Sequence, residues 1–380
     1  MNQRTTDAPR TSPRLIPSGS PAREAWEALA LGEPIICAPM AGAAGARLAT
    51  AVRAAGGLGL VGVGHGAGGE YIEREVGGAA RAAGEPGTGT GSWGAGFMSW
   101  SLALDDHAAL RSALKFEPPV VALSAGDPTA AARLAARAGA LVAVQVGTVA
   151  EVKAAAEQSD VSLLVVRGAE GGGHGLNELS TLPLLQYAVG VTDKPVAAAG
   201  GIASAAGVAA VLAAGAVAAW IGTRFVPCVE SLTPPGLKEA IAAATGDDTV
   251  YSSVFDAALG IPWPREYGGR ALANEISAAW GGRVEALREA ARGQAAGQAS
   301  PLAQAPGGRA GASRPGADAA REAVERVRRG RAEGDPATAP VYAGQAAGLV
   351  PIDAAAHTAA EIVAELAGFR EHLRRAARAW

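Results

Sequence analysis

The stretch Arg167-Gly168-Ala169-Glu170-Gly171-Gly172-Gly173-His174-Gly175 is the one from which the fold of this 380-residue chain can be worked out. It follows an apolar run, Val161 to Val166, that is typical of a buried strand. Its five glycines let backbone N–H groups approach a ligand closely, and folding alone does not require that many. A histidine in such a loop can exchange protons near neutral pH. The alternative is a flexible linker that contains a histidine.

Strand-like and helix-like segments alternate on both sides of this loop, from residue 34 to residue 226. Eight apolar segments are expected to be strands: 34–40, 58–63, 93–98, 120–123, 141–146, 161–166, 195–199 and 218–225. They recur every 20 to 30 residues or so, roughly the period of a (β/α)₈ barrel, and their continuous apolar character is typical of parallel strands covered on both faces. An open doubly wound sheet is the alternative, but eight unbroken units favour the closed barrel.

The rest of the chain is expected to add to this barrel. The predicted fold class is α/β, a (β/α)₈ TIM barrel with a smaller, mostly helical C-terminal appendage. The expected segments are a tail with a disordered start at 1–30, the barrel core at 31–228, an appended substrate-side segment at 229–290, a low-complexity disordered insertion at 291–318, and helices closing on the barrel at 319–380.

Composition limits the partners and the compartment that can be expected. The formal net charge is −3 and charged residues make up 18%, so neither nucleic acid nor a membrane surface is an expected partner. No apolar run reaches the roughly 18 residues that span a bilayer. Cys37 and Cys228 lie in apolar runs, as expected of core thiols in a reducing, cytoplasmic compartment. An organelle-targeting role for residues 1–20 and the oligomeric state stay open, and no metal-ligand spacing is found.

Glycine-rich turns at the ends of the last two strands indicate a phosphate site. Gly200 and Gly201 follow the seventh strand and offer unobstructed N–H donors. Late in the eighth, Gly222 precedes Thr223, which adds a hydroxyl and another N–H. Barrels most often bind phosphate at these two loops. An ordinary turn would explain Gly200-Gly201 alone, but the pair of loops favours phosphate.

Together these segments resemble the nitronate monooxygenases, formerly called 2-nitropropane dioxygenases. The resemblance rests on a Glu-x-Gly-Gly-His core at 170–174, Ala-Ala-Gly-Gly-Ile at 198–202 and Gly-Thr-Arg-Phe at 222–225. It covers residues 34–290 and returns at 341–349, which is similar to the family's C-terminal Ala-Gly-Gln segment. The same core is shared with the flavin-dependent enoyl-acyl-carrier-protein reductases, which are the rival family.

The resemblance implies a barrel that binds FMN without a covalent bond and a histidine that faces the substrate. His174 is the implied catalytic residue. The phosphate would be held by the two glycine turns, the isoalloxazine ring would lie along the end of the first strand, and a polar contact would come from the fifth strand. The implied FMN residues are Ala38, Pro39, Met40, Gln145, Gly172, Gly173, Ala199, Gly200, Gly201, Gly222 and Thr223. For Gln145 an incidental polar strand end is the alternative.

The implied reaction is oxidation of an alkyl nitronate, or of a nitroalkane, by O₂ to a carbonyl compound and nitrite. FMN would accept the electrons, and the protein would supply geometry and charge. His174 would take the α-proton of a nitroalkane or hold the charge of a nitronate, the alternative being a structural, hydrogen-bonded imidazole. An NAD(P)H-dependent enoyl reductase and a non-catalytic flavin-binding barrel are the alternative functions.

Some positions depart from the family pattern. Arg167 stands where the family usually has Gln, and it could face the flavin, an anionic substrate or an ion-pair partner. Residues 94–100 lack the family's Asn-containing strand-three motif. Glu170 could act as a base, but the favoured role is to anchor the glycine loop through backbone N–H groups. His65 could reach the mouth of the barrel, with a structural or rim role favoured.

Overall fold

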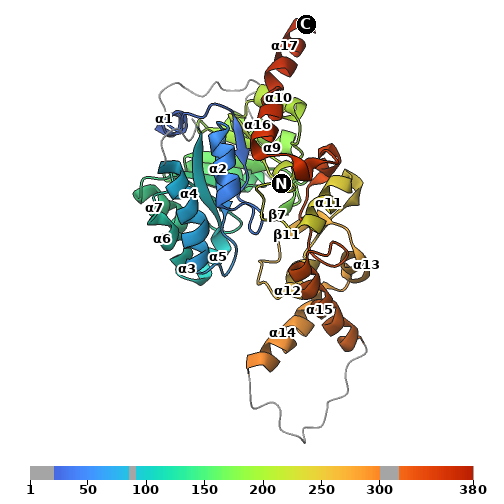
Figure 1. Cartoon of the computed structure of the whole chain (residues 1–380). Coiled ribbons are helices and arrows are strands. Elements are labelled where there is room, and N and C mark those ends of the chain that lie inside the picture. Colours follow the sequence, from blue (N-terminus) through green and yellow to red (C-terminus); the bar gives the residue numbers. More distant parts are fainter. Residues whose placement is uncertain (1–20, 85–90, 300–315, 380) are drawn as a thin grey trace, which may run out of the picture.

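Eight parallel strands close into a barrel in the order β1-β2-β3-β4-β5-β6-β8-β9 (Figure 1). The computed structural model describes residues 21–84, 91–299 and 316–379. The strands are β1 (Ile35–Cys37), β2 (Leu58–Gly62), β3 (Ser92–Met98), β4 (Val120–Ser124), β5 (Leu141–Val146), β6 (Leu163–Arg167), β8 (Val196–Ala199) and β9 (Ala218–Ile221). The predicted (β/α)₈ barrel is confirmed.

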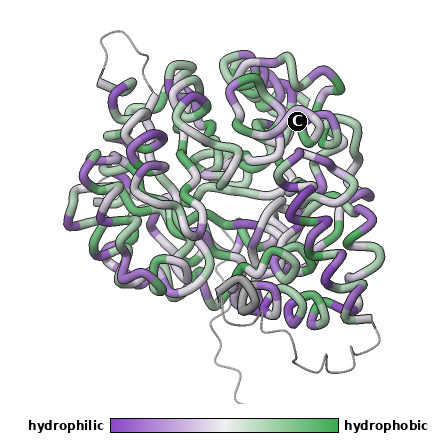
Figure 2. The backbone as a smooth tube through the Cα atoms, turned by 60° about the horizontal axis from the view of Figure 1, so that its bottom comes forward, coloured by the Kyte–Doolittle hydropathy of each residue, from purple (hydrophilic) through white to green (hydrophobic). Residues whose placement is uncertain are grey.

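Helices connect successive strands and cover the outside of the barrel. They are α2 (Ala46–Ala54), α3 (Gly69–Tyr71), the π-turn η1 (Ile72–Val76), α4 (Gly77–Gly84), α5 (Ser99–Leu104), α6 (Ala108–Leu114), α7 (Thr129–Arg137), α8 (Val149–Glu157), α9 (Thr181–Val191) and α10 (Ala205–Ala213). Thr148 and Ser204 cap α8 and α10 by accepting backbone N–H groups of the first turn. Figure 2 shows hydrophilic stretches on the outer turns and a hydrophobic or neutral tube inside the barrel.

The sequence also predicts a single helix over residues 105–116 with Asp105 as its N-cap, and this prediction is wrong. Two helices, α5 and α6, occupy this region. The chain turns between them because Asp106 and His107 adopt left-handed φ angles of 50° and 61°. Asp105 still contributes, since its carboxylate accepts the backbone N–H of Ala109 at 3.4 Å.

The barrel interior is filled by side chains and closed at the amino end of the strands. Ile36, Leu60 and Trp220 belong to the cluster inside the barrel, and Trp26 packs against it from α1 (Pro21–Glu27). The predicted tail at 1–30 is therefore wrong from residue 21 onward, because apolar side chains of this segment bury against the strands. Residues 1–20 lie outside the described residues.

The eighth strand of the barrel, β9, ends earlier than expected. It stops at Ile221, and residues 223–225 form a short 3₁₀ turn, η2 (Thr223–Phe225). Arg224 in this turn is fully buried and donates to Glu365 at 2.6 Å and to His357 Nδ1 at 3.2 Å. The sequence pattern places His357 on an outer helix and predicts a solvated side chain, but His357 instead helps to tie the C-terminal segment to the barrel.

A second lobe follows the barrel. Its elements are α11 (Pro235–Ala243), η3 (Gly246–Asp248), β10 (Thr249–Ser252), α12 (Val254–Leu259), β11 (Gly268–Leu272), α13 (Glu275–Trp280), α14 (Val284–Ala299), α15 (Ala317–Glu333), η5 (Gln345–Leu349) and η6 (Ala354–Ala356). The last two helices, α16 (Ala359–Leu366) and α17 (Phe369–Ala379), pack on the barrel instead. This lobe is mostly helical, as predicted, but it contains a three-stranded antiparallel sheet in the order β10-β11-β7. The strand β7 (Gly173–Gly175) comes from the glycine loop of the barrel, so backbone pairing joins the two lobes.

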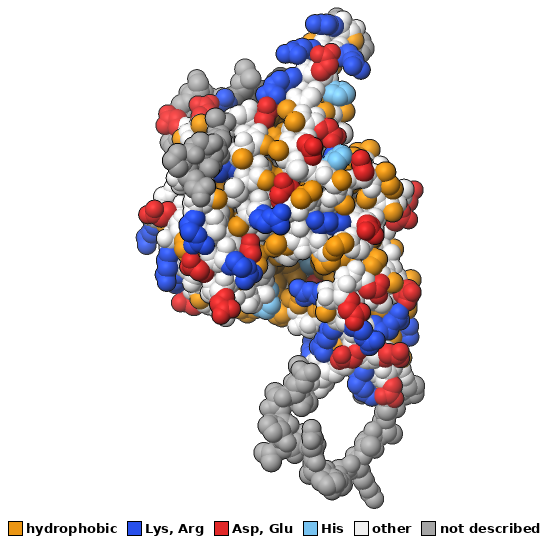
Figure 3. Space-filling model, in the orientation of Figure 1, with side chains coloured by type: hydrophobic (Ala, Val, Ile, Leu, Met, Phe, Trp, Pro, Cys, Tyr) orange, Lys and Arg blue, Asp and Glu red, His pale blue; other side chains and the backbone are white. Residues whose placement is uncertain are grey.

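The insertion predicted at 291–318 is helical at both edges. The chain continues α14 through Ala299 and enters α15 at Ala317, while residues 300–315 lie outside the described residues. Leu287 of α14 and Val324 and Val327 of α15 share one buried cluster, and this contact extends the helices beyond what their composition predicts. The two helices form a projecting hairpin (Figure 1), whose surface carries acidic and basic side chains together (Figure 3).

The C-terminal segment returns to the barrel. Ile362 and Leu366 of α16 belong to the cluster between the barrel and its helices, and α17 then projects outward (Figure 1). The sequence also predicts one helix over residues 357–379, but the structure has two helices here, with a break at Gly368. Within the described segments, no helix has both the length and the apolar character needed to cross a membrane.

Gly59 provides a test of how closely the barrel packs. A Cβ at this position in β2 would lie 2.0 Å from the carbonyl oxygen of Ala49 in α2. Gly59→Ala is expected to lower the free energy of unfolding by about 1–3 kcal/mol or more, because neither backbone can move away cheaply. Thermal unfolding followed by circular dichroism measures this loss.

Gly68→Ala is the matched control, since its φ is −79° and no atom lies within 4 Å of the added Cβ. Equal midpoints for the two variants would contradict the packing described for β2 and α2.

Candidate active site

Arg167 holds the glycine loop at the carboxyl end of β6. Its Nη2 donates to the carbonyl oxygens of Gly171 at 2.6 Å, Gly172 at 3.2 Å and Gly173 at 2.9 Å. Its Nη1 donates to the carbonyl of Leu176 at 3.3 Å. The side chain is buried, and burial lowers the pKa of Arg167 to about 10, so it remains cationic at neutral pH. Arg167 thus fixes the conformation of the glycine loop by binding its carbonyl oxygens, a role that the sequence did not predict.

Glu170 fixes the other side of the loop. Its carboxylate accepts the backbone N–H of Thr181 at 3.0 Å, where α9 begins. The hydroxyl of Thr181 in turn donates to the carbonyls of Ala199 and Gly200, at 2.9 Å and 3.1 Å. Glu170 therefore anchors the loop through a backbone N–H group, as expected, and links it to the end of β8.

A group of backbone donors lies at the ends of β8 and β9. Gly200 and Gly201 have left-handed φ angles of 106° and 70°, which glycine adopts without strain. In the described part of the chain, the N–H groups of Gly200, Gly201 and Thr223 donate to no protein acceptor. Unpaired N–H groups on adjacent turns suit an anionic phosphate, so the residues present fit the phosphate of FMN.

The C-terminal segment closes over these turns. The backbone N–H of Gly344 donates to the hydroxyl oxygen of Thr223 at 3.0 Å, and that of Gln345 donates to the carbonyl of Glu170 at 2.9 Å. A Cβ at Gly172 would lie 2.6 Å from the nitrogen of Gly344. The glycine loop, the η2 turn and residues 343–345 are therefore packed against one another.

The remaining predicted FMN residues lie on the same rim of the barrel. Ala38, Pro39 and Met40 follow β1, which pairs with β9 through Cys37 and Ile221. The sulfur of Met40 lies 3.5 Å from the position of a Cβ at Gly222, so the structure brings these two turns together. Gln145 lies near the end of β5 and is half-buried.

His174 projects from β7 toward a carboxylate of the second lobe. Its Nε2 lies 2.9 Å from both carboxylate oxygens of Asp256, in the first turn of α12. Its side chain is 13% exposed, and that of Asp256 is 3% exposed. The antiparallel pairing of His174 with Gly269 sets this geometry, because it draws the glycine loop alongside β11.

A row of aromatic rings extends from the rim to His174. His65, which donates to or accepts from Ser101 at 2.8 Å, packs against Trp100 with ring centroids 4.9 Å apart. Trp100 packs against Trp263 at the same separation, and Trp263 stacks on His174 at 3.8 Å with 5° between the ring planes. The ring row forms an apolar wall beside the histidine.

The loop 261–267 contributes Trp263 to this wall and lies at the mouth of the barrel. Tyr267 at its end donates to Glu151 of α8 at 3.2 Å and accepts the backbone N–H of Gly126 at 3.1 Å. Its partner Glu151 also accepts the backbone N–H of Gly147 at 2.6 Å. The loop is therefore fastened to the turns after β4 and β5 while Trp263 reaches toward β7.

Sequence reasoning missed Asp256, Trp263, Tyr342 and the role of Arg167. A signal for Asp256 exists: it is the one acid in residues 249–265, inside the apolar run Val254-Phe255-Asp256-Ala257-Ala258-Leu259. A carboxylate in such a run is rarely buried without a partner. The partner could not be named, since the two residues are 82 positions apart.

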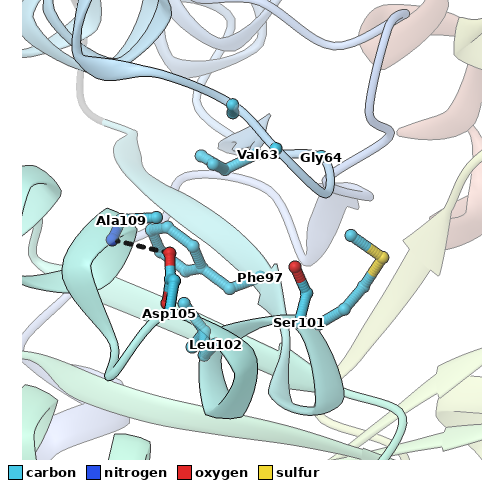
Figure 4. A pocket seen from close by; sticks show the side chains of 10 residues that line it. Val63, Gly64, Phe97, Ser101, Leu102, Asp105 and Ala109 are labelled. Atoms are coloured by element: carbon cyan, nitrogen blue, oxygen red, sulfur yellow. Dashed lines mark hydrogen bonds between the residues drawn. The ribbon is translucent and has the colours of Figure 1, made fainter. Parts of the chain in front are cut away.

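A small cavity lies beyond the aromatic row, between the ends of β2 and β3. Val63, Phe97 and Ser101 are among its lining residues (Figure 4). Its volume of about 20 Å³ is close to what a single water molecule needs, so it is too small for the substrate. In the part of the chain that the structure describes, no group of three or more His, Cys, Asp or Glu side chains could hold a metal ion.

Arg167→Met tests the role of the guanidinium. Several loop carbonyls would lose a charged donor, and we expect the free energy of unfolding to fall by about 3 kcal/mol or more. Urea unfolding measures the loss. Arg81→Met is the control, because Arg81 forms an exposed ion pair with Glu73 and its loss should change stability by less than about 1 kcal/mol. Equal losses in the two variants would contradict the role given to Arg167.

Comparison with known proteins agrees with this site. A family profile described as nitronate monooxygenase matches residues 97–367. Nitronate monooxygenase npaC of Metarhizium robertsii is 32% identical over 261 residues, covering 63% of this chain and 72% of that protein. FabK of Thermotoga maritima superposes with a TM-score of 0.71 and 26% identity over 94% of this chain and 99% of its own. Nitroalkane oxidase of Streptomyces ansochromogenes superposes with a TM-score of 0.68 and 26% identity, covering 93% of this chain and 99% of its own.

The profile matches more than half of the chain and spans the glycine loop, the turns at Gly200-Gly201 and Gly222-Thr223, and Asp256. The solved structures extend the likeness in fold to nearly the whole molecule. The chain therefore belongs to the nitronate monooxygenase family of flavin-dependent oxidoreductases.

Proposed function

We propose that this protein is an FMN-dependent nitronate monooxygenase that uses O₂ to oxidise alkyl nitronates, and nitroalkanes through their nitronates, to carbonyl compounds and nitrite. The proposal rests on two features that lie on the same rim of the barrel. A histidine anchored by a carboxylate, His174, shares that rim with unpaired backbone donors at Gly200, Gly201 and Thr223. Family membership narrows the chemistry to this reaction class.

FMN is the cofactor that we propose for the rim. When bound, it would supply the electron acceptor and the centre that reacts with O₂. Its phosphate would be held by Gly200, Gly201, Gly222 and Thr223, whose N–H groups have no acceptor among the described residues and are free to donate to the phosphate oxygens. The remaining contacts would come from Ala38, Pro39, Met40, Gln145, Gly172, Gly173 and Ala199.

His174 would handle the substrate's proton or charge. A neutral nitroalkane must lose its α-proton, and an imidazole within reach can take it. A preformed nitronate needs no base, and a protonated imidazole would balance its negative charge. The stacked ring of Trp263 shields the histidine from bulk water, which strengthens either interaction.

The partners that we propose are small molecules, a nitronate or nitroalkane and O₂. The formal charge of −3 gives no basis for a nucleic-acid partner. The buried free thiols of Cys37 and Cys228 support a reducing, cytoplasmic location.

The direct experiment is purification, a visible spectrum and an oxygen-electrode assay with a nitronate. Flavin absorbance and nitrite release without any nicotinamide are expected. Absence of flavin even after reconstitution with FMN would contradict the cofactor. NADH oxidation coupled to enoyl-thioester reduction, without nitronate turnover in air, would indicate an enoyl reductase. Bound flavin with neither activity would indicate a non-catalytic flavin-binding barrel.

Gly201→Val tests the phosphate turn. The variant should lose FMN, because Gly201 has a φ of 70° and a branched side chain would crowd the donors and meet Glu170 at 3.1 Å. The flavin-to-protein absorbance ratio after gel filtration measures retention. Gly139→Val is the matched control, with φ of 87° and no atom within 4 Å of its Cβ. Equal flavin loss in both variants would mean that backbone strain, and not the phosphate turn, is responsible.

His174→Asn tests the proposed base. FMN should remain bound, because the substitution removes none of the proposed phosphate donors. Turnover of a neutral nitroalkane should fall by about 10²-fold or more if the imidazole takes the proton. A preformed nitronate should be less affected, or should show a higher KM if the imidazole holds its charge. Unchanged kinetics with both substrates would remove His174 from the mechanism.

A further inference from the structure

The second lobe supplies the group that controls His174. We propose that Asp256 is a positioning residue, which keeps the proton of the neutral imidazole on Nε2 and leaves Nδ1 as the nitrogen that takes the substrate proton. The inference rests on the proposed function and deepens it, because it assigns one nitrogen of one ring to the reaction.

The geometry defines the tautomer. Both carboxylate oxygens of Asp256 lie 2.9 Å from Nε2 of His174. An ionised carboxylate only accepts hydrogen bonds, so Nε2 must carry the proton that it donates. In the described residues Nδ1 has no hydrogen-bond partner, and its lone pair is therefore available.

The ring is also held in its plane. Trp263 stacks on one face of His174 at 3.8 Å and 5°, and Tyr342 packs against the ring at 5.0 Å and 52°. Rotation that exchanged the two nitrogens would break the stack and the contact with Asp256 together. The stacking tryptophan and the carboxylate both belong to residues 254–263, so one segment sets the plane and the tautomer.

Asp256 is itself kept in place as an acceptor. The hydroxyl of Tyr342 donates to its Oδ1 at 3.4 Å. Burial, and then the charge of Asp256, raise the pKa of Tyr342 well above its ordinary value, so the phenol remains a donor. Burying a carboxylate is unfavourable unless partners compensate, and an apolar residue at this point in α12 would stabilise the lobe more simply. A role in proton transfer explains its presence better than packing does.

The assigned step balances. The C–H bond at the α-carbon of the nitroalkane breaks, its proton bonds to Nδ1, and its electron pair is delocalised onto the nitro group as the nitronate. The imidazolium that forms is stabilised by the negative charge of Asp256. The proton leaves later to solvent, which restores the neutral ring.

The first test needs neither cofactor nor substrate. ¹⁵N-labelled histidine in the full chain gives five imidazole spin systems, and His174→Asn identifies the one that belongs to His174. At a pH where the ring is neutral, we expect the proton on Nε2 in a single tautomer. Loss of that fixed tautomer is expected in Asp256→Asn, whose amide can donate to Nε2. A proton on Nδ1 in the wild type, or an unchanged spectrum in Asp256→Asn, would overturn the proposal.

The second test is kinetic. Asp256→Asn should lower kcat for a neutral nitroalkane by about 10²–10⁴-fold, the range by which a wrong tautomer slows a histidine base. Its kcat for preformed nitronate should change much less, and Asp256→Glu should recover part of the nitroalkane rate. Asp353→Asn is the control, because Asp353 forms an exposed pair with His357 at 3.4 Å and both substrates should react as in the wild type.

Equal losses for the two substrates in Asp256→Asn would indicate a structural role and overturn the assignment. If wild-type protein oxidises neither substrate, the proposed function fails, while the tautomer measurement still decides whether Asp256 sets the proton on His174.

Discussion

The mouth of the barrel depends on the buried guanidinium of Arg167, which forms no ion pair with a carboxylate of the described residues. A segment as rich in glycine as residues 171–175 loses much conformational entropy when it becomes ordered. The guanidinium of Arg167 offsets that cost by taking several carbonyls of the loop into charged hydrogen bonds. Since the carbonyls point inward to the arginine, the loop has one shape. That shape lets Gly173 to Gly175 pair with β11 as a strand.

The pairing with β11 explains how distant parts of the chain build one site. The barrel contributes the imidazole and the N–H donors, and the second lobe contributes Asp256 and Trp263. Tyr267 fastens the same lobe to the turns after β4 and β5. Residues 343–345 then bind the glycine loop and Thr223 from the other side. Each of these contacts joins residues that are far apart in the sequence, so the site forms only in the complete fold.

This division also explains what the sequence could predict. Local periodicity and motifs a few residues long were enough to predict the barrel strands, the turns at Gly200 and Gly222, and His174 as a site residue. The boundaries that failed were decided by packing: α1 against the barrel floor, and α14 against α15. Asp256 stood out as a charge in an apolar run, but its partner is fixed by the register of β7 on β11. No local pattern encodes that register.

The sheet β10-β11-β7 joins the turns proposed to hold the cofactor to the segment that supplies Asp256 and Trp263. Most of the residues proposed to hold the cofactor lie at the ends of barrel strands or in the glycine loop, while Asp256 and the stacking Trp263 come from residues 254–267. Changes in that short segment can reshape the chamber without touching the cofactor turns, as long as β11 still pairs with the glycine loop. The shape of the chamber and the proposed cofactor contacts are therefore set by largely different parts of the chain, and the backbone pairing between β7 and β11 keeps those parts in register.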